Sequence, residues 1–152
     1  MSTTFSTDST ANATPLTLDS ALSAQVHVLG DALRSKGWTV SSAESCTGGG
    51  VAFAFTSVAG SSDWFNQSWV TYSNDAKRSV LGVTEQTLKE YGAVSKQTVK
   101  EMAEGVRRNS GAQLVVTVSG IAGPGGGSEE KPVGTVWFGF LCGEHEMQIK
   151  QV

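Results

Sequence analysis

The fold is decided by residues 38–58, WTVSSAESCTGGGVAFAFTSV, where the character of the sequence changes twice. WTVSSAE has the length of a short strand, and SCTGGG is a glycine-rich turn. The apolar residues that follow, from about Gly49 to Val58, predict a helix. Strands that alternate with helices are typical of α/β proteins.

The segments on either side predict four more helices. The first has Asp19 or Ser20 as its N-cap, repeats leucine or valine at spacings of four, three and four residues, and ends at Gly37. Asn74 is expected to cap a helix over residues 75–82. Thr84 and Ser95 are expected to cap two further helices, each with apolar residues placed as a hydrophobic staple.

Four more strands complete the pattern. They are expected within residues 64–73, 112–120, 133–143 and 146–152, the last two joined as a hairpin through Gly143. The stretch AQLVVTVSG at 112–120 is continuously apolar, as expected for a strand buried on both faces. We therefore predict an α/β fold, a three-layer α/β/α sandwich with a mixed, mainly parallel sheet, in a single domain over residues 17–152.

The composition argues against several classes of protein. Residues 1–16 are rich in Ser and Thr, with one charged side chain, and are expected to be a disordered tail. A net charge of −3 gives no basic surface for nucleic acid, and no apolar run approaches the roughly 20 residues that cross a bilayer. Two cysteines and the lack of a signal sequence favour the cytoplasm, and two isolated histidines argue against a metal site. We expect no cofactor.

The glycine turn holds the first candidate for chemistry. Ser45 and Cys46 precede three glycines, so a nucleophile and backbone N–H groups could face the same space, as beside an oxyanion hole. Alternatively, Ser45 or Thr47 only caps the helix that follows. Cys46 is a second candidate nucleophile, since thiolates are more reactive, although a free cysteine is often a small buried apolar residue.

A serine nucleophile needs a base, and the histidines are poorly placed to supply it. Lys77 is the alternative, because it lies in the first turn of its expected helix, where the helix dipole disfavours an ammonium group. That dipole shifts the pKa by less than one unit, so burial must supply most of the change, with Arg78 a possible source of repulsion. The phenol of Tyr72 could relay a proton. The simpler alternatives are a solvated lysine and a tyrosine packed in the core.

A second glycine-rich loop, SGIAGPGGG at residues 119–127, leaves the buried strand. Its backbone amides could line a phosphate or carboxylate. It matches neither the dinucleotide-binding nor the P-loop pattern.

Together, AESCTGGG (43–50), YSNDAKRSVLGV (72–83) and VSGIAGPGGGSEEKPVGTVWFGF (118–140) resemble the successive signatures of the CinA C-terminal domain family. The resemblance covers about residues 20–150 and implies a three-layer α/β domain that hydrolyses the carboxamide of nicotinamide mononucleotide, yielding ammonia, without a metal. It also implies a homo-oligomer, a small-molecule nicotinamide nucleotide as the partner, and neither nucleic acid nor membrane.

Carried over residue by residue, the resemblance assigns catalytic roles to Ser45, Tyr72 and Lys77. The substrate-binding residues that we predict are Cys46, Thr47, Gly48, Gly49, Asn74, Ser119, Gly120, Ile121, Ala122, Gly123 and Lys131, with Lys131 and the second glycine loop near the phosphate and ribose.

The chain departs from the family pattern at both ends. The family normally continues past the last strand into a Gly-Asp-Arg stretch and a closing helix. If that piece is absent rather than trimmed, one layer of the sandwich is exposed and any ligand arginine there is missing. Many relatives also carry an N-terminal nucleotide-processing domain, so this chain resembles the standalone form.

Overall fold

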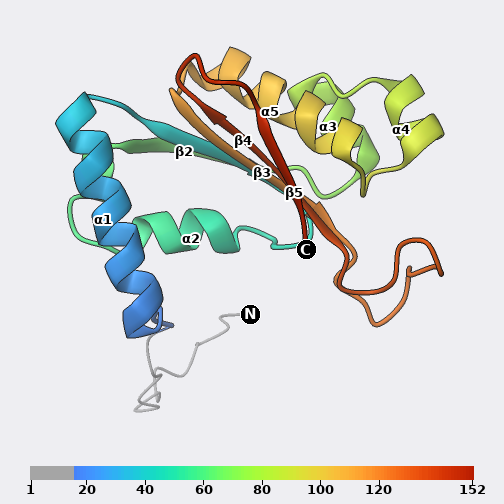
Figure 1. Ribbon diagram of the computed structural model, residues 1–152, viewed down its shortest axis with the longest axis horizontal. Helices are drawn as coiled ribbons and strands as arrows, with labels where there is room; N and C mark the ends of the chain where they lie inside the picture. Colours follow the sequence, from blue (N-terminus) through green and yellow to red (C-terminus); the bar gives the residue numbers. More distant parts are fainter. Residues whose placement is uncertain (1–15) are drawn as a thin grey trace, which may run out of the picture.

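A five-stranded sheet with helices on both faces makes up residues 16–152, the part of the chain that the computed structural model describes (Figure 1). The predicted tail of residues 1–16 lies outside the described residues, except for Leu16. The strands are β1 (Val40–Glu44), β2 (Phe65–Val70), β3 (Leu114–Gly120), β4 (Val136–Cys142) and β5 (Gln148–Gln151). The helices are α1 (Ser20–Lys36), α2 (Gly50–Thr56), α3 (Asn74–Leu81), α4 (Glu85–Tyr91) and α5 (Lys96–Ser110), with a short 3-10 helix, η1 (Ser61–Asp63), before β2.

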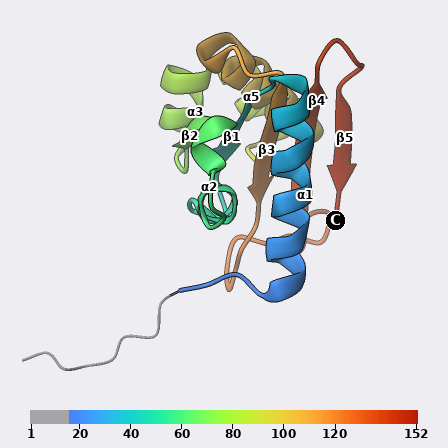
Figure 2. The ribbon, with the colours of Figure 1, turned by 90° about the vertical axis from the view of Figure 1, so that its left-hand side faces the viewer.

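The strands lie in the order β2-β1-β3-β4-β5, which Figure 2 shows from left to right. β1 is parallel to both of its neighbours, whereas β4 is antiparallel to both of its own. β4 therefore runs against the common direction of the other four strands. The prediction of a mixed, mainly parallel sheet is confirmed, as is the hairpin from β4 to β5.

Two apolar cores lie on opposite faces of the sheet, because successive strand residues point to opposite sides. Val40 belongs to the core under α1 and α2, and Ala43 belongs to the core under α3 and α5. In the same way, Leu114 and Val116 face the first core and Val115 the second. The three-layer sandwich is confirmed.

The predicted helix caps are correct for three helices and wrong for one. Asp19, Thr84 and Ser95 each accept a bond from the backbone N–H three residues later. The N-cap of α3 is Ser73, not Asn74: Ser73 has an extended backbone, and its hydroxyl accepts a bond from the Ala76 N–H at 3.1 Å. Lys77 is therefore the fourth residue of its helix rather than the third.

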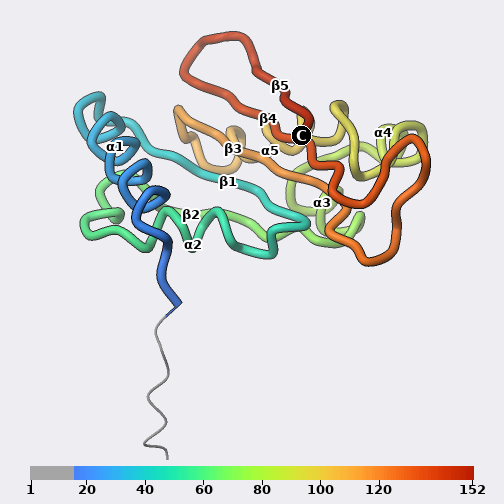
Figure 3. Tube along the Cα trace, turned by 60° about the horizontal axis from the view of Figure 1, so that its bottom comes forward, coloured from blue at the N-terminus to red at the C-terminus, as the bar shows by residue number. Residues whose placement is uncertain are grey.

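The carboxyl ends of β2, β1 and β3 share one edge of the sheet, since these strands are parallel neighbours. The turn into α2 and the start of α3 both lie at this edge. The loop of residues 121–135 projects beyond the ends of β3 and β4 on the side of α3 and α4 (Figure 3). This edge gathers the three segments that the sequence marks as functional, as ligand sites in α/β sheets commonly do.

Candidate active site

Ser45 lies directly after β1, the strand between β2 and β3. Its N–H donates to the carbonyl of Val118 at 3.0 Å, which continues the pairing of β1 with β3 by one residue. The residue is only 7% exposed. Its backbone is therefore fixed by the sheet rather than left to a free loop.

Lys77 reaches Ser45 from α3. Its Nζ lies 3.1 Å from Ser45 Oγ, 2.8 Å from the carbonyl oxygen of Thr71 and 3.0 Å from that of Tyr72. The lysine is 1% exposed, so the alternative of a solvated surface lysine is wrong. The structure thus brings together two of the three side chains predicted to be catalytic.

The surroundings of Lys77 disfavour its charged form. Burial lowers the pKa of Lys77 below its ordinary value, and the nearby Cys46 thiol opposes this only in part. Within residues 16–152, Lys77 forms no ion pair with a carboxylate. A buried amine without a counter-ion is the setting in which a lysine becomes a base.

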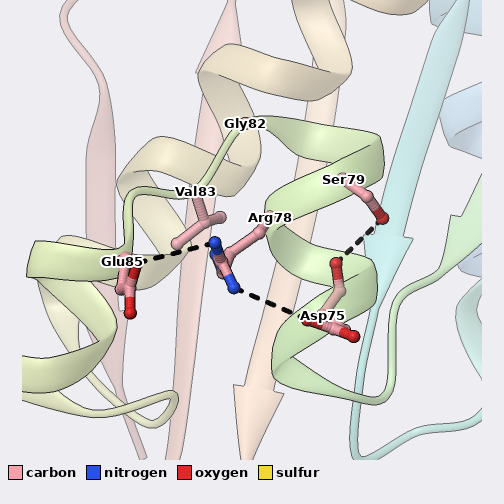
Figure 4. A pocket seen from close by; sticks show the side chains of 6 residues that line it. All are labelled: Asp75, Arg78, Ser79, Gly82, Val83 and Glu85. Carbon is pink, nitrogen blue, oxygen red and sulfur yellow. Dashed lines mark hydrogen bonds and ion pairs between the residues drawn. The ribbon is translucent and has the colours of Figure 1, made fainter.

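Arg78 is not the source of repulsion considered from the sequence. It forms ion pairs with Asp75, at 3.5 Å, and with Glu85, at 3.6 Å. Figure 4 shows its guanidinium between these two carboxylates, in a cavity of about 510 Å³ between α3 and α4. The charge of Arg78 is therefore balanced by two carboxylates. Burial is the main cause of the lowered pKa of Lys77.

Tyr72 contacts the pair through its backbone. Its carbonyl oxygen accepts bonds from Lys77 and, at 3.5 Å, from Ser45, whereas the residue as a whole is 71% exposed. The alternative of a tyrosine packed in the core is therefore wrong. No hydrogen bond joins its phenol to Ser45 or Lys77 in the described residues.

The turn between β1 and α2 is held by a residue that sequence reasoning missed. The N-cap of α2 is Gly49, without a side-chain bond, so the alternative in which Ser45 or Thr47 caps this helix is wrong. Instead, the buried carboxylate of Glu44 accepts bonds from the Thr47 hydroxyl and from the first free N–H groups of α2. An acidic residue at the end of a buried strand, directly before the turn, was the available signal.

The glycines of this turn are needed for its shape. Gly48 and Gly49 have φ angles of 57° and 107°, which residues with a side chain rarely adopt. Within the described chain, the N–H groups of Cys46 and Thr47 donate to no oxygen. Both instead face the sulfur of Cys46 and act to lower its pKa. These two N–H groups thus have no oxygen acceptor among the described residues, and they lie at the two positions that follow Ser45.

Cys46 itself is half-buried. Burial outweighs these N–H groups and raises the pKa of its thiol, which disfavours a thiolate. A Cβ on Gly120 would lie 3.0 Å from the Cys46 sulfur, so the second glycine loop begins against the turn. This close approach explains a glycine at position 120.

The other predicted binding residues fall into two groups. The first group, Ser119 and Ile121, already has partners within the protein. The Ser119 hydroxyl donates to the Ala93 carbonyl at 2.8 Å, and the Ile121 N–H donates to the Thr135 carbonyl at 3.0 Å. The second group consists of residues that are exposed or half-exposed: Gly48, Gly49, Asn74, Gly120, Ala122 and Gly123.

Lys131 is set apart from the pair formed by Ser45 and Lys77. Its Nζ donates to the carbonyl of Tyr91 at 2.7 Å. It also lines a cavity of about 410 Å³ with Ser95 and Trp137. Trp137 pairs with Ser119 across β4 and β3, so this cavity adjoins the same edge of the sheet.

The family model for the CinA C-terminal domain matches residues 22–152. The chain belongs to this family. It is 64% identical over 112 residues to the nicotinamide-nucleotide amidohydrolase PncC of Enterobacter agglomerans, covering 74% of this chain and 68% of that protein. It is 54% identical over 128 residues to PncC of Escherichia coli K12, covering 84% of this chain and 78% of that protein.

Solved structures of CinA-family proteins have the same fold. The competence/damage inducible protein CihA from Agrobacterium tumefaciens superposes with a TM-score of 0.86 at 43% identity, covering 91% of this chain and 83% of the other. The match confirms the predicted family and fold. In this CinA domain, residues 16–152 contain no group of three His, Cys, Asp or Glu side chains suited to a metal ion, and no helix long and apolar enough to cross a membrane.

Proposed function

We propose that this CinA domain hydrolyses the carboxamide of nicotinamide mononucleotide, with Ser45 as nucleophile and Lys77 as base. The observation that carries the proposal is the 3.1 Å approach of the buried Lys77 amine to the Ser45 hydroxyl. The names of the PncC relatives support the substrate. The alternative is a pyridine-nucleotide sensor or interaction module without turnover.

The partners of Lys77 can hold its amine after it has lost a proton. A neutral amine has two N–H groups and one lone pair. Lys77 Nζ donates to the carbonyls of Thr71 and Tyr72, at 2.8 and 3.0 Å, and to Ser45 Oγ at 3.1 Å. When the amine loses its third proton, the two carbonyls retain the remaining N–H groups and the lone pair is left for the Ser45 hydroxyl. Lys77 then accepts the serine proton once the Ser45 hydroxyl has turned from the Tyr72 carbonyl to the amine.

The reaction follows from this arrangement. Ser45 Oγ bonds to the carboxamide carbon as its proton moves to Lys77, and the N–H groups of Cys46 and Thr47 stabilise the oxyanion. The C–N bond then breaks, and the leaving nitrogen takes the proton from Lys77 and departs as ammonia. Water attacks the resulting ester and gives a proton to Lys77. Lys77 returns this proton to Ser45 Oγ as the ester C–O bond breaks, which releases nicotinate mononucleotide and restores the enzyme.

The remaining predicted residues would hold the rest of the ligand. We assign the ribose and phosphate to the exposed or half-exposed start of the second glycine loop, Gly120–Gly123, together with Asn74 and Lys131. A cytoplasmic location and a homo-oligomer of two or more chains remain predictions. Light scattering on the purified chain would measure the oligomer.

The direct test is ammonia release from nicotinamide mononucleotide by the wild type and by Cys46→Ala. We expect turnover by both, with kcat/KM of the variant within about fivefold of the wild type, because burial keeps this thiol protonated. Loss of activity in Cys46→Ala alone would make the cysteine the nucleophile. A folded wild type that binds the nucleotide without releasing ammonia would favour the sensor. Nicotinamide riboside, which lacks the phosphate, serves as the comparison substrate.

A second test separates the two groups of Tyr72. Tyr72→Phe is expected to keep kcat within about threefold of the wild type, because the contact with Lys77 comes from the backbone carbonyl and the residue is 71% exposed. Steady-state kinetics with nicotinamide mononucleotide measure this. A drop of tenfold or more would restore the predicted proton relay through the phenol.

A further inference from the structure

Glu44 is a fully buried carboxylate next to the proposed nucleophile, with 0% exposure. Residues 43 and 45 face the α3 and α5 side of the sheet, so residue 44 faces α2. Lys77 therefore approaches from one face and Glu44 lies on the other. The Glu44 side chain has no place in the proton transfers described above.

The contacts of Glu44 all come from the turn and from α2. Oε1 accepts bonds from the Thr47 hydroxyl at 2.6 Å and from the Val51 N–H at 2.8 Å. Oε2 accepts a bond from the Ala52 N–H at 2.9 Å. Within residues 16–152, no cation pairs with this carboxylate. Three hydrogen-bond donors and the positive end of the α2 helix dipole stabilise its negative charge.

These contacts tie both ends of the turn to one strand. Glu44 is fixed in β1, where it pairs with Val70 on one side and Val118 on the other. The bond to Thr47 holds the middle of the turn, and the bonds to α2 hold its far end. Between these points lie Ser45 and the N–H groups of Cys46 and Thr47, which have no oxygen acceptor in residues 16–152.

We propose that Glu44 is a positioning residue for the acyl transfer assigned above, on which this role depends. Its carboxylate fixes the Thr47 hydroxyl and the start of α2, so that the N–H groups of Cys46 and Thr47 are preset toward the oxyanion. It also occupies the first free N–H groups of α2, so the phosphate of the substrate binds elsewhere. A shift of about 1 Å in such donors costs up to roughly a hundredfold in rate.

Two variants weaken the hydrogen bonds of the Glu44 carboxylate while keeping side chains of nearly the same shape. Glu44→Gln keeps the shape but sets an amide nitrogen against one of three donors. Thr47→Val deletes only the hydroxyl that meets Glu44, and Thr47→Ser keeps it. We expect kcat about a hundredfold lower in Glu44→Gln and about tenfold lower in Thr47→Val, with Thr47→Ser recovering most of the kcat that Thr47→Val loses because it returns the hydroxyl. KM should stay within about twofold in all three.

Glu101→Gln is the matched control. Its carboxylate likewise holds the start of a helix, α4, through the N–H of Thr84 at 2.7 Å and the Thr87 hydroxyl at 2.5 Å, but on a different part of the chain. It should lower the melting temperature and leave kcat unchanged. If Glu44→Gln behaves like this control, with a lower melting temperature and at least half the wild-type kcat when folded, Glu44 only stabilises the fold. A higher KM at unchanged kcat would equally overturn the positioning role.

A second readout does not depend on the substrate. A fluorophosphonate forms a bond between phosphorus and Ser45 Oγ as fluoride leaves, and its phosphoryl oxygen needs the same N–H donors. The rate of labelling of Ser45, followed by mass spectrometry, should fall in Glu44→Gln and Thr47→Val but not in Thr47→Ser or Glu101→Gln. If the wild type is labelled but releases no ammonia, the substrate assignment fails while these rates still decide the role of Glu44. Equal labelling rates in all variants would refute that role.

Discussion

Ser45→Ala is expected to lower kcat for ammonia release from nicotinamide mononucleotide by about 10⁴-fold or more. Without the hydroxyl no ester with the enzyme can form, and the Lys77 amine loses the group to which it lies 3.1 Å away. The N–H groups of Cys46 and Thr47 stay in place, so a small residual rate above that in water is expected from transition-state stabilisation alone. Ammonia release at saturating substrate, with the variant at high concentration, measures this residual activity.

The loss must be separated from damage to the fold. Ser45 is 7% exposed, and its main structural bond is the backbone N–H to Val118, which alanine keeps. The variant should therefore melt within a few degrees of the wild type. Ser41→Ala, at another buried serine of β1, is the matched control and should keep full kcat. Activity of Ser45→Ala above a tenth of the wild type would remove Ser45 from the mechanism.

The fold could be predicted because its signals are local. The strand, glycine turn and helix of residues 38–58 each follow from composition and length, and the caps at Asp19, Thr84 and Ser95 are confirmed by their hydrogen bonds. The prediction of Asn74 as the N-cap of α3 was wrong. Ser73 and Asn74 are both good N-cap residues, and only the backbone dihedral angles distinguish between them.

The site could be predicted only in part, because its geometry depends on the directions of groups far apart in sequence. The burial of Lys77 and its approach to Ser45 need a helix and a strand to meet, which no local pattern specifies. The partners at Thr71 and Tyr72 are backbone carbonyls, which have no signature in the side-chain sequence. For the same reason Tyr72 was selected for its phenol, while the structure uses its carbonyl in the contact.

Lys77→Met is expected to lower kcat by about 10³-fold and to leave KM within a few fold, because a positioned base contributes about 10²- to 10⁴-fold and the carboxamide does not need it for binding. The double variant with Ser45→Ala should be no slower than Ser45→Ala alone, since the two groups act as one unit. Lys89→Met, at an exposed lysine of α4, is the matched control and should keep full activity.

The pH dependence and Lys77→Arg test whether Lys77 works as a neutral base. The active form is the unprotonated amine, so kcat/KM should rise with pH through the pKa of Lys77. Burial lowers this pKa, so the rise should come at lower pH than for an ordinary lysine. Arginine keeps a positive charge but does not lose its proton in proteins, so Lys77→Arg should be as inactive as Lys77→Met at every pH tested. If Lys77→Arg keeps a tenth or more of the wild-type kcat, the lysine supplies charge rather than a base, and the lone pair directed at Ser45 has no part in the reaction.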